Sequence, residues 1–324
     1  MKNNTDFIDW ANDWLKFNGY SLQNAPEILL ETPWSNVVKF STVKEDLYLK
    51  QTASLIYVEA AIIKLLANKF NANVANLIAT NEKLHCFLML DAGPTLRKYL
   101  KSNFDPNLIR EAIAQFAFLQ RSIENNLESF FELGVPDWRL DKLPGLYDQI
   151  INQTDLLIAS GLTDDELQIL QGLRKKVVEQ CSLLSQYKIP ETLVQPDCNT
   201  NNILINTNTK EMTIIDLGEI AIAHPFLSLG NFLYQTTIHE GIKEQDTVYN
   251  QIQDVYLDHW SGSSAKSQLL DIMQLIKKIH PIYNVLFHYR LMLFVDLKDY
   301  DLYYANKTNQ IARYFREYIE INPH

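Results

Sequence analysis

The chain has 324 residues, of which 47% are hydrophobic, and a formal net charge of −10 at pH 7. This length suffices for two lobes with sizeable cores, and a count of only 10 glycines is typical of a folded, helix-rich globular protein. The acidic balance disfavours nucleic acid as a partner, because phosphate binding needs basic stripes that the sequence lacks. It fits a cationic small-molecule partner, although acidic charge also keeps ordinary proteins soluble.

No apolar stretch approaches the roughly twenty residues of a transmembrane helix, and no signal-peptide core follows the first four residues. We therefore expect a soluble protein without a membrane partner, which is not exported by the ordinary route. The three cysteines, Cys86, Cys181 and Cys198, form no C-x-x-C pair, which fits free thiols in a reducing cytoplasm. The sequence specifies no oligomeric state.

Residues 6–17 are predicted to form a helix with its apolar side chains along one face. Residues 26–51 then read as three short antiparallel strands, with turns at 32–35 and 43–46. Lys50 lies at the end of the third of these strands.

A second amphipathic run, at residues 57–67, is predicted to be a helix and carries Glu59 nine residues after Lys50. A buried lysine needs an acidic partner, so an ion pair from strand to helix is expected. Two unrelated surface charges are the alternative.

An apolar strand at residues 85–91 breaks at a Gly-Pro pair, and the chain beyond it is strongly helical. Thr95 is placed to cap the first of these helices. Helices are predicted at residues 95–101, 108–127, 142–158, 163–185, 231–240, 244–260, 265–279, 281–296 and 308–319.

The most informative stretch is residues 195–218, Q-P-D-C-N-T-N-N-I-L-I-N-T-N-T-K-E-M-T-I-I-D-L-G. It places Asp197, Asn202 and Asp216 on two short apolar strands joined by a polar turn. Phosphoryl transfer needs a carboxylate near the accepting hydroxyl and oxygen ligands for magnesium. In that chemistry Asp197 would orient the hydroxyl, while Asn202 and Asp216 would hold the metal.

An Asp followed five residues later by an Asn arises by chance in so asparagine-rich a chain, so the pair alone is a weak signal. Its coupling to a strand-turn-strand pattern and to Asp216-Leu217-Gly218 is much more specific. This tripeptide reads as a kinase D-F-G with a conservative change, since only the Asp touches metal.

These motifs resemble those of the aminoglycoside phosphotransferase-like family of small-molecule kinases, which includes choline-kinase-like proteins. Members typically read H-G-D-x-x-x-x-N, then I-D-[FWL]-[GE]-[DE], then a segment similar to G-H-P-F. This chain has Asp197 and Asn202 at the required spacing, I-D-L-G-E at residues 215–219, and A-H-P-F-L-S-L at residues 223–229. The resemblance extends over most of the chain.

The resemblance implies an α+β, two-lobed protein-kinase-like fold. The N-terminal lobe, residues 1–92, would hold a small antiparallel sheet with a helix and would end at the hinge. The C-terminal lobe, residues 93–324, would be large and mostly helical. It would carry the catalytic loop at 195–202 and the metal-binding segment at 216–218.

The implied activity is transfer of the γ-phosphoryl group of ATP, with GTP as the alternative, to a hydroxyl of a small molecule. Magnesium would be the cofactor, and the acceptor would be aminoglycoside-, choline- or sugar-like. In this scheme the lysine contacts phosphates, the first hairpin turn covers them, and main-chain groups of the hinge bind adenine between apolar walls. The implied nucleotide-binding residues are Lys50, Glu59, Ser35, Asn36, Val38, Met89, Leu90, Asp91, Leu204 and Ile215.

Two departures from the family pattern keep a rival function open. Gln195 and Pro196 stand where members have His and Gly, and the hairpin lacks the glycines of a protein-kinase loop. Glutamine retains a donor and an acceptor, but proline fixes φ just before the proposed base. A catalytically silent nucleotide-binding or interaction module on the same fold is therefore the alternative. A protein kinase fits less well, because His224 follows Asp216 too soon for a long activation segment.

The acceptor side carries weaker signals. The segment V-P-D-W-R-L at 135–140 is similar to one in a bacterial branch of the family, where it would line the mouth of the acceptor site. A turn that starts a helix capped by Asp137 is the alternative. His224 is expected to make a structural hydrogen bond. Acids that could face a cationic acceptor are Glu219, Glu240, Asp254 and Asp258.

Overall fold

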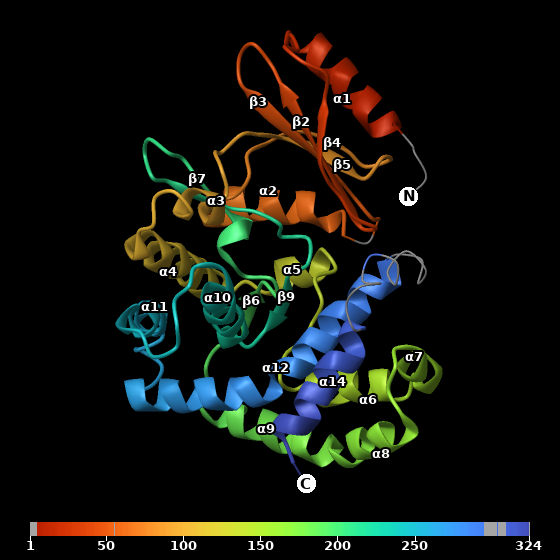
Figure 1. Ribbon diagram of the computed structural model, residues 1–324, viewed down its shortest axis with the longest axis vertical. Helices are drawn as coiled ribbons and strands as arrows, with labels where there is room; N and C mark the ends of the chain where they lie inside the picture. Colours follow the sequence, from red (N-terminus) through yellow and green to blue (C-terminus); the bar gives the residue numbers. More distant parts are fainter. Residues whose placement is uncertain (1–4, 55, 295–302, 304–308, 324) are drawn as a thin grey trace. The chain divides into compact units, whose positions relative to one another are not determined.

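The computed structural model describes residues 5–54, 56–294, 303 and 309–323 (Figure 1). The chain divides into two compact units, each described here by itself. The first unit comprises Met1–Pro94, Leu204–Gly218 and Leu291–Tyr303, and the second comprises Thr95–Ile203, Glu219–Arg290 and Tyr304–His324. The segments 204–218 and 291–303, which the sequence assigns to the C-terminal lobe, thus group with the first unit.

A five-stranded antiparallel sheet with strand order β1-β2-β3-β5-β4 forms the centre of the first unit. The predicted turns at 32–35 and 43–46 join β1 to β2 and β2 to β3. The sequence analysis did not predict β4, whose five residues are all half-buried. The strands are β1 (Glu27–Glu31), β2 (Ser35–Ser41), β3 (Asp46–Thr52), β4 (Leu77–Asn81) and β5 (Cys86–Leu90).

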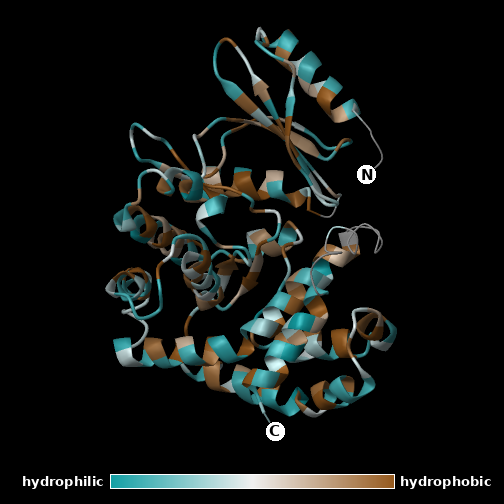
Figure 2. Cartoon of the chain, viewed as in Figure 1, coloured by the Kyte–Doolittle hydropathy of each residue, from teal (hydrophilic) through white to brown (hydrophobic). Residues whose placement is uncertain are grey.

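Two helices cover opposite faces of this sheet. The predicted first helix, α1 (Asp6–Phe17), buries Phe7, Ala11 and Leu15, which recur every four residues on one side. They pack against a continuous apolar face of the sheet, and Figure 2 shows the hydrophobic colour along its strands. The sheet residues of this cluster are Val38, Phe40, Leu47, Leu49, Cys86 and Leu88.

The second helix, α2 (Val58–Phe70), brings Glu59 in its first turn to Lys50 of β3. Because Lys50 and Leu49 are neighbours on one strand, their side chains point to opposite faces of the sheet. Since Leu49 belongs to the cluster under α1, α2 covers the other face. One face of β3 thus packs in the apolar core through Leu49, and the other face carries Lys50 of the charged cluster.

A small hairpin completes the first unit. It consists of β7 (Ile203–Ile205) and β8 (Met212–Ile214), joined by the predicted polar turn. The Ile205 amide donates to the Pro94 carbonyl at 2.9 Å, and Ile214 forms a parallel bridge with Val74. Asp216 follows β8 by two residues, so this hairpin fixes where the predicted metal-binding segment begins.

Helices make up most of the second unit, and most of the predicted ones are present. Its helices up to the catalytic loop are α3 (Leu96–Leu100), α4 (Pro106–Ile123), α5 (Glu128–Glu132), α6 (Leu143–Ile151), α7 (Thr154–Ala159), α8 (Asp164–Gly172) and α9 (Arg174–Gln186). The elements that follow are β6 (Thr192–Val194), the 3-10 turn η1 (Thr200–Asn202), β9 (Ala221–Ala223), α10 (Phe226–His239), α11 (Thr247–Asp258), α12 (Lys266–Phe294) and α14 (Gln310–Ile321).

Several predicted helix boundaries are wrong. The helix predicted at 142–158 is divided into α6 and α7, and the one at 163–185 into α8 and α9. A capping box between Thr163 and Glu166 starts α8. In contrast, the helices predicted at 265–279 and 281–296 are one, because α12 continues through Pro281.

Proline removes a helical hydrogen bond and bends a helix, and Figure 1 shows α12 changing direction along its length. Residues 295, 296 and 308 of the predicted helices lie outside the described residues. Nowhere in the described part of the chain is a helix both long and apolar enough to span a membrane.

Candidate active site

A buried cluster of three charges lies in the first unit. Lys50 Nζ is 2.7 Å from Glu59 Oε2 and 2.5 Å from Asp216 Oδ1. The side chains of Lys50 and Glu59 are 9% and 2% exposed, whereas that of Asp216 is 37% exposed. The ion pair that the sequence predicts between β3 and α2 is therefore present. Lys50 also contacts Asp216, whose carboxylate the sequence predicts to be a magnesium ligand.

The charge on Lys50 is stabilised by its two partners. Burial favours the neutral amine, but the carboxylates of Asp216 and Glu59 outweigh burial and raise the pKa of Lys50. Lys50 therefore remains an ammonium at neutral pH. An ammonium held by Glu59 can meet the charge of a second anion without first taking up a proton.

The segment at 216–218 is held against the start of α2. Asp216 has a left-handed backbone, with φ of 61°, and the Leu217 amide donates to Glu59 Oε1 at 3.1 Å. A Cβ on Gly218 would lie 2.3 Å from Ile56 Cγ2 and 3.2 Å from Glu59 Oε2. A larger residue at 218 would collide with Ile56, so this close approach explains why the third residue of the tripeptide is glycine.

The hairpin residues expected to contact phosphate are engaged within the hairpin. The Ser35 amide donates to Thr32 Oγ1 at 2.9 Å, and the Asn36 side chain donates to Gln51 Oε1 at 3.2 Å. The Ser35 hydroxyl is buried and makes no hydrogen bond to a described residue. In this conformation the Ser35 backbone donor is therefore used by the turn itself.

Val38 does not face the side of the sheet that carries Lys50. The register pairs Lys50 with Val37, while Val38 pairs with Leu49 and belongs to the apolar cluster under α1. A nucleotide beside Lys50 would therefore meet Val37, which is half-buried. Val38, the predicted adenine wall, thus lies on the opposite face of the sheet from Lys50, because one position along a strand reverses the face.

The predicted hinge residues lie at the end of β5. Met89 and Leu90 are half-buried at the end of β5 and Asp91 is exposed. The Leu90 amide donates to the Asn76 carbonyl and the Asp91 amide to the Asp46 carbonyl, so both donors are engaged. Gly93, with φ of 102°, packs on β7: a Cβ there would lie 2.2 Å from the Ile205 carbonyl oxygen.

The two other expected apolar walls, Leu204 and Ile215, both belong to the first unit. Each is half-buried, in contrast to its fully buried strand neighbours such as Ile205 and Ile214. Partial exposure of an apolar side chain is what a ligand-lining position requires.

The catalytic loop lies in the second unit, after β6. Asn202 Nδ2 donates both to the Asp197 carbonyl at 2.9 Å and to Asp197 Oδ2 at 3.1 Å. Asn199 Nδ2 donates to the same Asp197 carbonyl at 2.8 Å. Both bonds of Asn202 use its amide nitrogen, so a cation would be held by its amide oxygen. The five-residue spacing thus joins the two side chains directly.

A charged network from α3 and α10 supports this loop, and the sequence analysis missed its role. Arg97 Nη2 donates to Asn199 Oδ1 at 3.0 Å, and its Nε lies 3.3 Å from Thr200 Oγ1 and 3.7 Å from Glu240 Oε1. The Thr200 hydroxyl donates to Glu240 at 2.5 Å. One oxygen of Glu240 thus supports the loop, whereas Glu240 Oε2 is buried and makes no hydrogen bond to a described residue. No local pattern around Arg97 indicates the contact, because its partners lie over a hundred residues away.

Helix α10 holds the loop through its main chain. The Gln195 backbone amide donates to Ser228 Oγ at 3.0 Å, and Asn231 Nδ2 donates to the Cys198 carbonyl at 3.1 Å. Gln195 is 2% exposed. The loop is therefore bound to α10 on both sides of Asp197.

His224 makes the structural contact expected of it. It is fully buried, and its Nδ1 accepts from the Phe226 amide at 3.3 Å. Burial lowers the pKa of His224 to about 3, so the ring is neutral. It therefore supplies no charge or proton at neutral pH.

The segment at 135–140 is a sheet extension. Asp137 bridges Ile222 of β9, and the Trp138 amide donates to the Ile222 carbonyl at 2.8 Å. Asp137 pairs with Arg139 at 2.6 Å and makes no cap on α6, whose first turn lacks a side-chain cap. The helix-capping alternative is therefore wrong.

The remaining acidic candidates are also engaged. Asp254 pairs with Lys266 at 2.8 Å, and Asp258 is among the charges that act on Lys266. Glu219 acts on Arg290, whose guanidinium donates to the Ile220 carbonyl at 3.0 Å. Within the described residues no group of three or more His, Cys, Asp or Glu side chains forms a metal site. Magnesium held by one Asp and one Asn would not require such a group.

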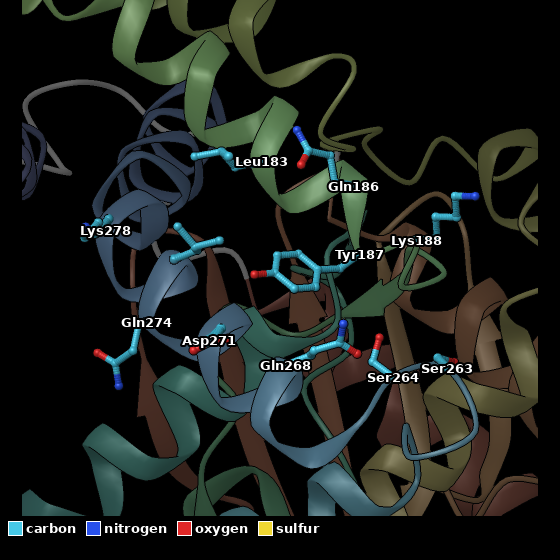
Figure 3. A pocket seen from close by; sticks show the side chains of 11 residues that line it. Leu183, Gln186, Tyr187, Lys188, Ser263, Ser264, Gln268, Asp271, Gln274 and Lys278 are labelled. Atoms are coloured by element: carbon cyan, nitrogen blue, oxygen red, sulfur yellow. The ribbon is translucent and has the colours of Figure 1, made fainter.

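A separate cavity of about 770 Å³ lies between the end of α9 and the first half of α12. Figure 3 shows the Tyr187 ring extending into it, with polar side chains such as Gln268 and Asp271 around the rim. None of its lining residues belongs to the catalytic loop or to the residues predicted from sequence.

Solved structures match the fold over nearly the whole chain. The GDP and kanamycin complex of APH(2")-IIia has a TM-score of 0.58 and 15% identity, and the match covers 97% of this chain and 98% of that one. A choline/ethanolamine kinase family protein from Mesorhizobium loti has a TM-score of 0.61 and 14% identity, with 98% and 96% covered. A macrolide 2'-phosphotransferase from Brachybacterium faecium has a TM-score of 0.57 and 12% identity, with 98% and 99% covered.

No protein-family model matches the chain, and neither does any curated protein. At 11–15% identity the matches establish the fold, and the structural neighbours are small-molecule phosphotransferases. The α+β, two-lobed fold that the sequence implies is confirmed. The chain has the protein-kinase-like fold shared by aminoglycoside and macrolide phosphotransferases and by choline/ethanolamine kinases.

Proposed function

We propose that this chain transfers the γ-phosphoryl group of ATP to a hydroxyl of a small molecule. The observation that carries the proposal is the Lys50 ammonium held between buried Glu59 and partly exposed Asp216. A buried cation beside an accessible carboxylate suits a polyphosphate with a divalent ion, because the lysine and the carboxylate then each meet an opposite charge. GTP in place of ATP is the alternative nucleotide.

The residues fit this chemistry. Lys50, fixed by Glu59, binds phosphate oxygens, and the half-buried Val37, Leu204 and Ile215 offer apolar contacts to a base. Asp216 and the amide oxygen of Asn202 are the hard oxygen ligands that magnesium prefers. Bound magnesium would neutralise charge on the transferred group.

Asp197 is assigned the acceptor hydroxyl. Asn202 Nδ2 fixes one carboxylate oxygen of Asp197, and the carboxylate accepts the hydroxyl proton as the new bond forms. Arg97 and Glu240 bind the side chains of Asn199 and Thr200 on the same loop and so help to keep Asp197 in place. We place the activity in the cytoplasm, since the three cysteines are free and buried.

The test is magnesium-dependent release of ADP from ATP across a panel of aminoglycosides, macrolides, choline, ethanolamine and sugars. Wild type should turn over at least one of them, and Asp197→Asn should lose ~10²–10⁴ in rate while retaining nucleotide binding. Asp141→Asn is the matched control, because Asp141 pairs with Lys142 on the surface of the same unit. Equal rates in wild type and Asp197→Asn would remove Asp197 from the reaction.

A catalytically silent nucleotide-binding module is the second candidate. It is favoured by the Ser35 amide, which donates to Thr32 and so is not presented to a phosphate. Such a module would bind magnesium and ATP yet release no ADP with any acceptor, and Asp197→Asn would behave as wild type does. Restoring the family dipeptide with Gln195→His and Pro196→Gly separates the two, because a decayed enzyme would gain turnover and an active one would change little.

A further inference from the structure

The cavity between α9 and α12 is lined by one side of each helix. On α9, Leu183 lines it, and Tyr187 follows one helical turn later, just past the end of the helix. The volume of about 770 Å³ lies within the range of small-molecule sites. On α12 the lining residues recur every three or four positions and so share one side of the helix, namely Gln268, Asp271, Leu275 and Lys278.

Contacts within the protein fix the two walls of this cavity. Asn322, which is 3% exposed and follows α14, donates to the Lys278 carbonyl of α12 at 3.2 Å. The same side chain accepts from Gln180 Nε2 of α9 at 2.6 Å, so it ties the two helices together. The Tyr187 amide donates back to the Leu184 carbonyl at 3.2 Å, which holds the tyrosine at the end of α9. The cavity is therefore formed before any ligand enters, as small-molecule sites usually are.

Most polar side chains around the cavity are not used by the protein itself. Gln268 Oε1 accepts the Ala265 amide at 3.1 Å and so helps to start α12. Other lining side chains make no hydrogen bond or ion pair with any described residue, and these are Gln186, Tyr187, Ser263, Ser264, Asp271 and Gln274. Amides and hydroxyls can each donate and accept, so the cavity offers both kinds of group to a ligand.

The charges around the cavity do not favour an anion. Figure 3 shows Lys188 and Lys278 at opposite ends, with Tyr187 and Asp271 between them. The Lys188 side chain points away from the tyrosine ring, and the Asp271 carboxylate would repel a phosphate held between the two lysines. The rest of the polar lining is neutral, with three glutamine amides and two serine hydroxyls. A neutral ligand rich in hydroxyls matches this set.

Tyr187 provides an apolar surface among these polar groups. Its half-buried ring extends into the cavity, and Leu183 and the half-buried Leu275 also line it. A sugar ring has a face of C–H groups and an edge of hydroxyls. It can therefore pack its face on the tyrosine while its hydroxyls meet the surrounding amides.

We propose that this cavity is a second ligand site, which binds a neutral carbohydrate of one or two rings. The C–H face of the sugar packs on Tyr187, and its hydroxyls bond to Asp271, Gln274 and their neighbours. The site shares no residue with the proposed phosphotransfer site. The inference therefore goes beyond the proposed function and does not depend on it.

Titration calorimetry of the full chain, without nucleotide, tests the site. The neutral probes are glucose, N-acetylglucosamine, maltose, sucrose and cellobiose, and the anionic probes are glucose 1-phosphate and inorganic phosphate. At least one neutral probe should bind with a Kd of about 1 mM or below, and more tightly than either anionic probe.

Variants locate the binding in the cavity. Tyr187→Ala should weaken the binding of that sugar by about tenfold, whereas Tyr187→Phe keeps the ring and should keep most of the affinity. Asp271→Ala should weaken binding severalfold, and because Asp271 is exposed this variant tests the site without disturbing the core. Phe118→Ala is the control, since it removes an aromatic ring that is 65% exposed on α4, outside the cavity. It should leave sugar binding unchanged.

The remaining outcomes separate this site from the proposed acceptor site. Asp197→Asn should bind the sugar as wild type does. Loss of sugar binding in Asp197→Asn, with unchanged binding in Tyr187→Ala, would overturn the cavity assignment and leave the proposed phosphotransfer intact. Failure of every neutral probe to bind, or tighter binding of inorganic phosphate that Lys188→Gln abolishes, would also overturn it. Sugar binding that depends on Tyr187 in a chain that releases no ADP would support the cavity site and count against the proposed enzyme alone.

Discussion

The two units stabilise their buried carboxylates in different ways. In the first unit Glu59 meets the Lys50 ammonium, which also contacts Asp216, so charge is matched by charge. In the second unit Glu191 accepts the Leu140 amide at 2.7 Å, and Glu240 shares Thr200 with a more distant Arg97. The first arrangement can exchange partners with an incoming anion and cation. In the second, neutral donors bond to the carboxylates, and Glu240 in this way supports the loop that carries Asp197.

Removing the Lys50 ammonium should lower the free energy of unfolding more than any other change proposed here. Lys50→Met leaves Glu59 and Asp216 close together without a counter-charge, and breaking a buried pair in this way costs about 3–5 kcal/mol. Chemical denaturation of wild type and variant measures the difference. Lys39→Met is the control, since the Lys39 pair with Asp46 is partly exposed and should be worth under about 1 kcal/mol. Equal losses in the two variants would show that the cluster has no special role.

In the second unit, Glu191 should make the free energy of unfolding depend on pH. Burial raises the pKa of Glu191 from 4.5 to about 7 despite the Leu140 amide, so the folded protein binds this proton more tightly than the unfolded chain. The contribution of Glu191 to the free energy of unfolding is therefore fully present below about pH 4.5 and is lost as pH rises to about 7.

Glu191→Gln keeps an acceptor for the Leu140 amide and removes the titration. Relative to the variant, wild type should lose roughly 1.4 kcal/mol of unfolding free energy per pH unit across that window. Denaturation series at several pH values measure this difference. The exposed Glu179→Gln is the control and should show no such slope. Parallel curves for wild type and Glu191→Gln would contradict the assignment.

Glu240→Gln should have a smaller effect that is specific to the loop. The glutamine still accepts from Thr200 but no longer attracts Arg97, so the loss is about 1–3 kcal/mol of stability. We also expect a lower kcat with little change in the KM for ATP, because the loop that carries Asp197 loosens. Glu244→Gln is the control, since Glu244 meets Lys277 at 3.9 Å on the surface. A raised KM for a cationic acceptor with unchanged kcat would instead make Glu240 a substrate contact.

The smallest effect distinguishes the two faces of β2. Val38→Ala removes buried methyl groups from the cluster under α1 and should cost about 1–2 kcal/mol without changing nucleotide affinity. Val37→Ala lies on the face of Lys50 and should weaken nucleotide binding severalfold with less loss of stability. Nucleotide titration and denaturation of both variants measure the two quantities. The reverse pattern would restore Val38 as the nucleotide wall.

The sequence predicts what depends on short spacings. Asp197 and Asn202 are predicted together from their five-residue spacing. The pairing of Lys50 with Glu59 is predicted from a strand followed nine residues later by a helix. The close approach at Gly218 is seen only in the structure. Faces of strands are less secure, because one residue reverses the face: the sequence predicts Val38 as the wall, whereas Val37 shares the face of Lys50.

The sequence does not predict contacts between residues that lie far apart along the chain. Arg97 reaches Asn199 and Thr200 across about a hundred positions, and Glu240 was interpreted as an acceptor contact because its partner could not be foreseen. Helix boundaries failed for a local reason: Pro281 is tolerated inside α12, although proline usually ends a helix.

The most direct test of the central claim, that Asp216 holds magnesium with the nucleotide, is the thermal midpoint of unfolding with ATP, with and without magnesium. A ligand that binds only the folded protein at a hundred times its Kd adds about 2.7 kcal/mol, which is readily seen as a raised midpoint. We predict that wild type shows a magnesium-dependent rise and that Asp216→Ala loses it, while Asp13→Ala, an exposed change on α1, keeps it. An undiminished magnesium-dependent rise in Asp216→Ala would contradict the account.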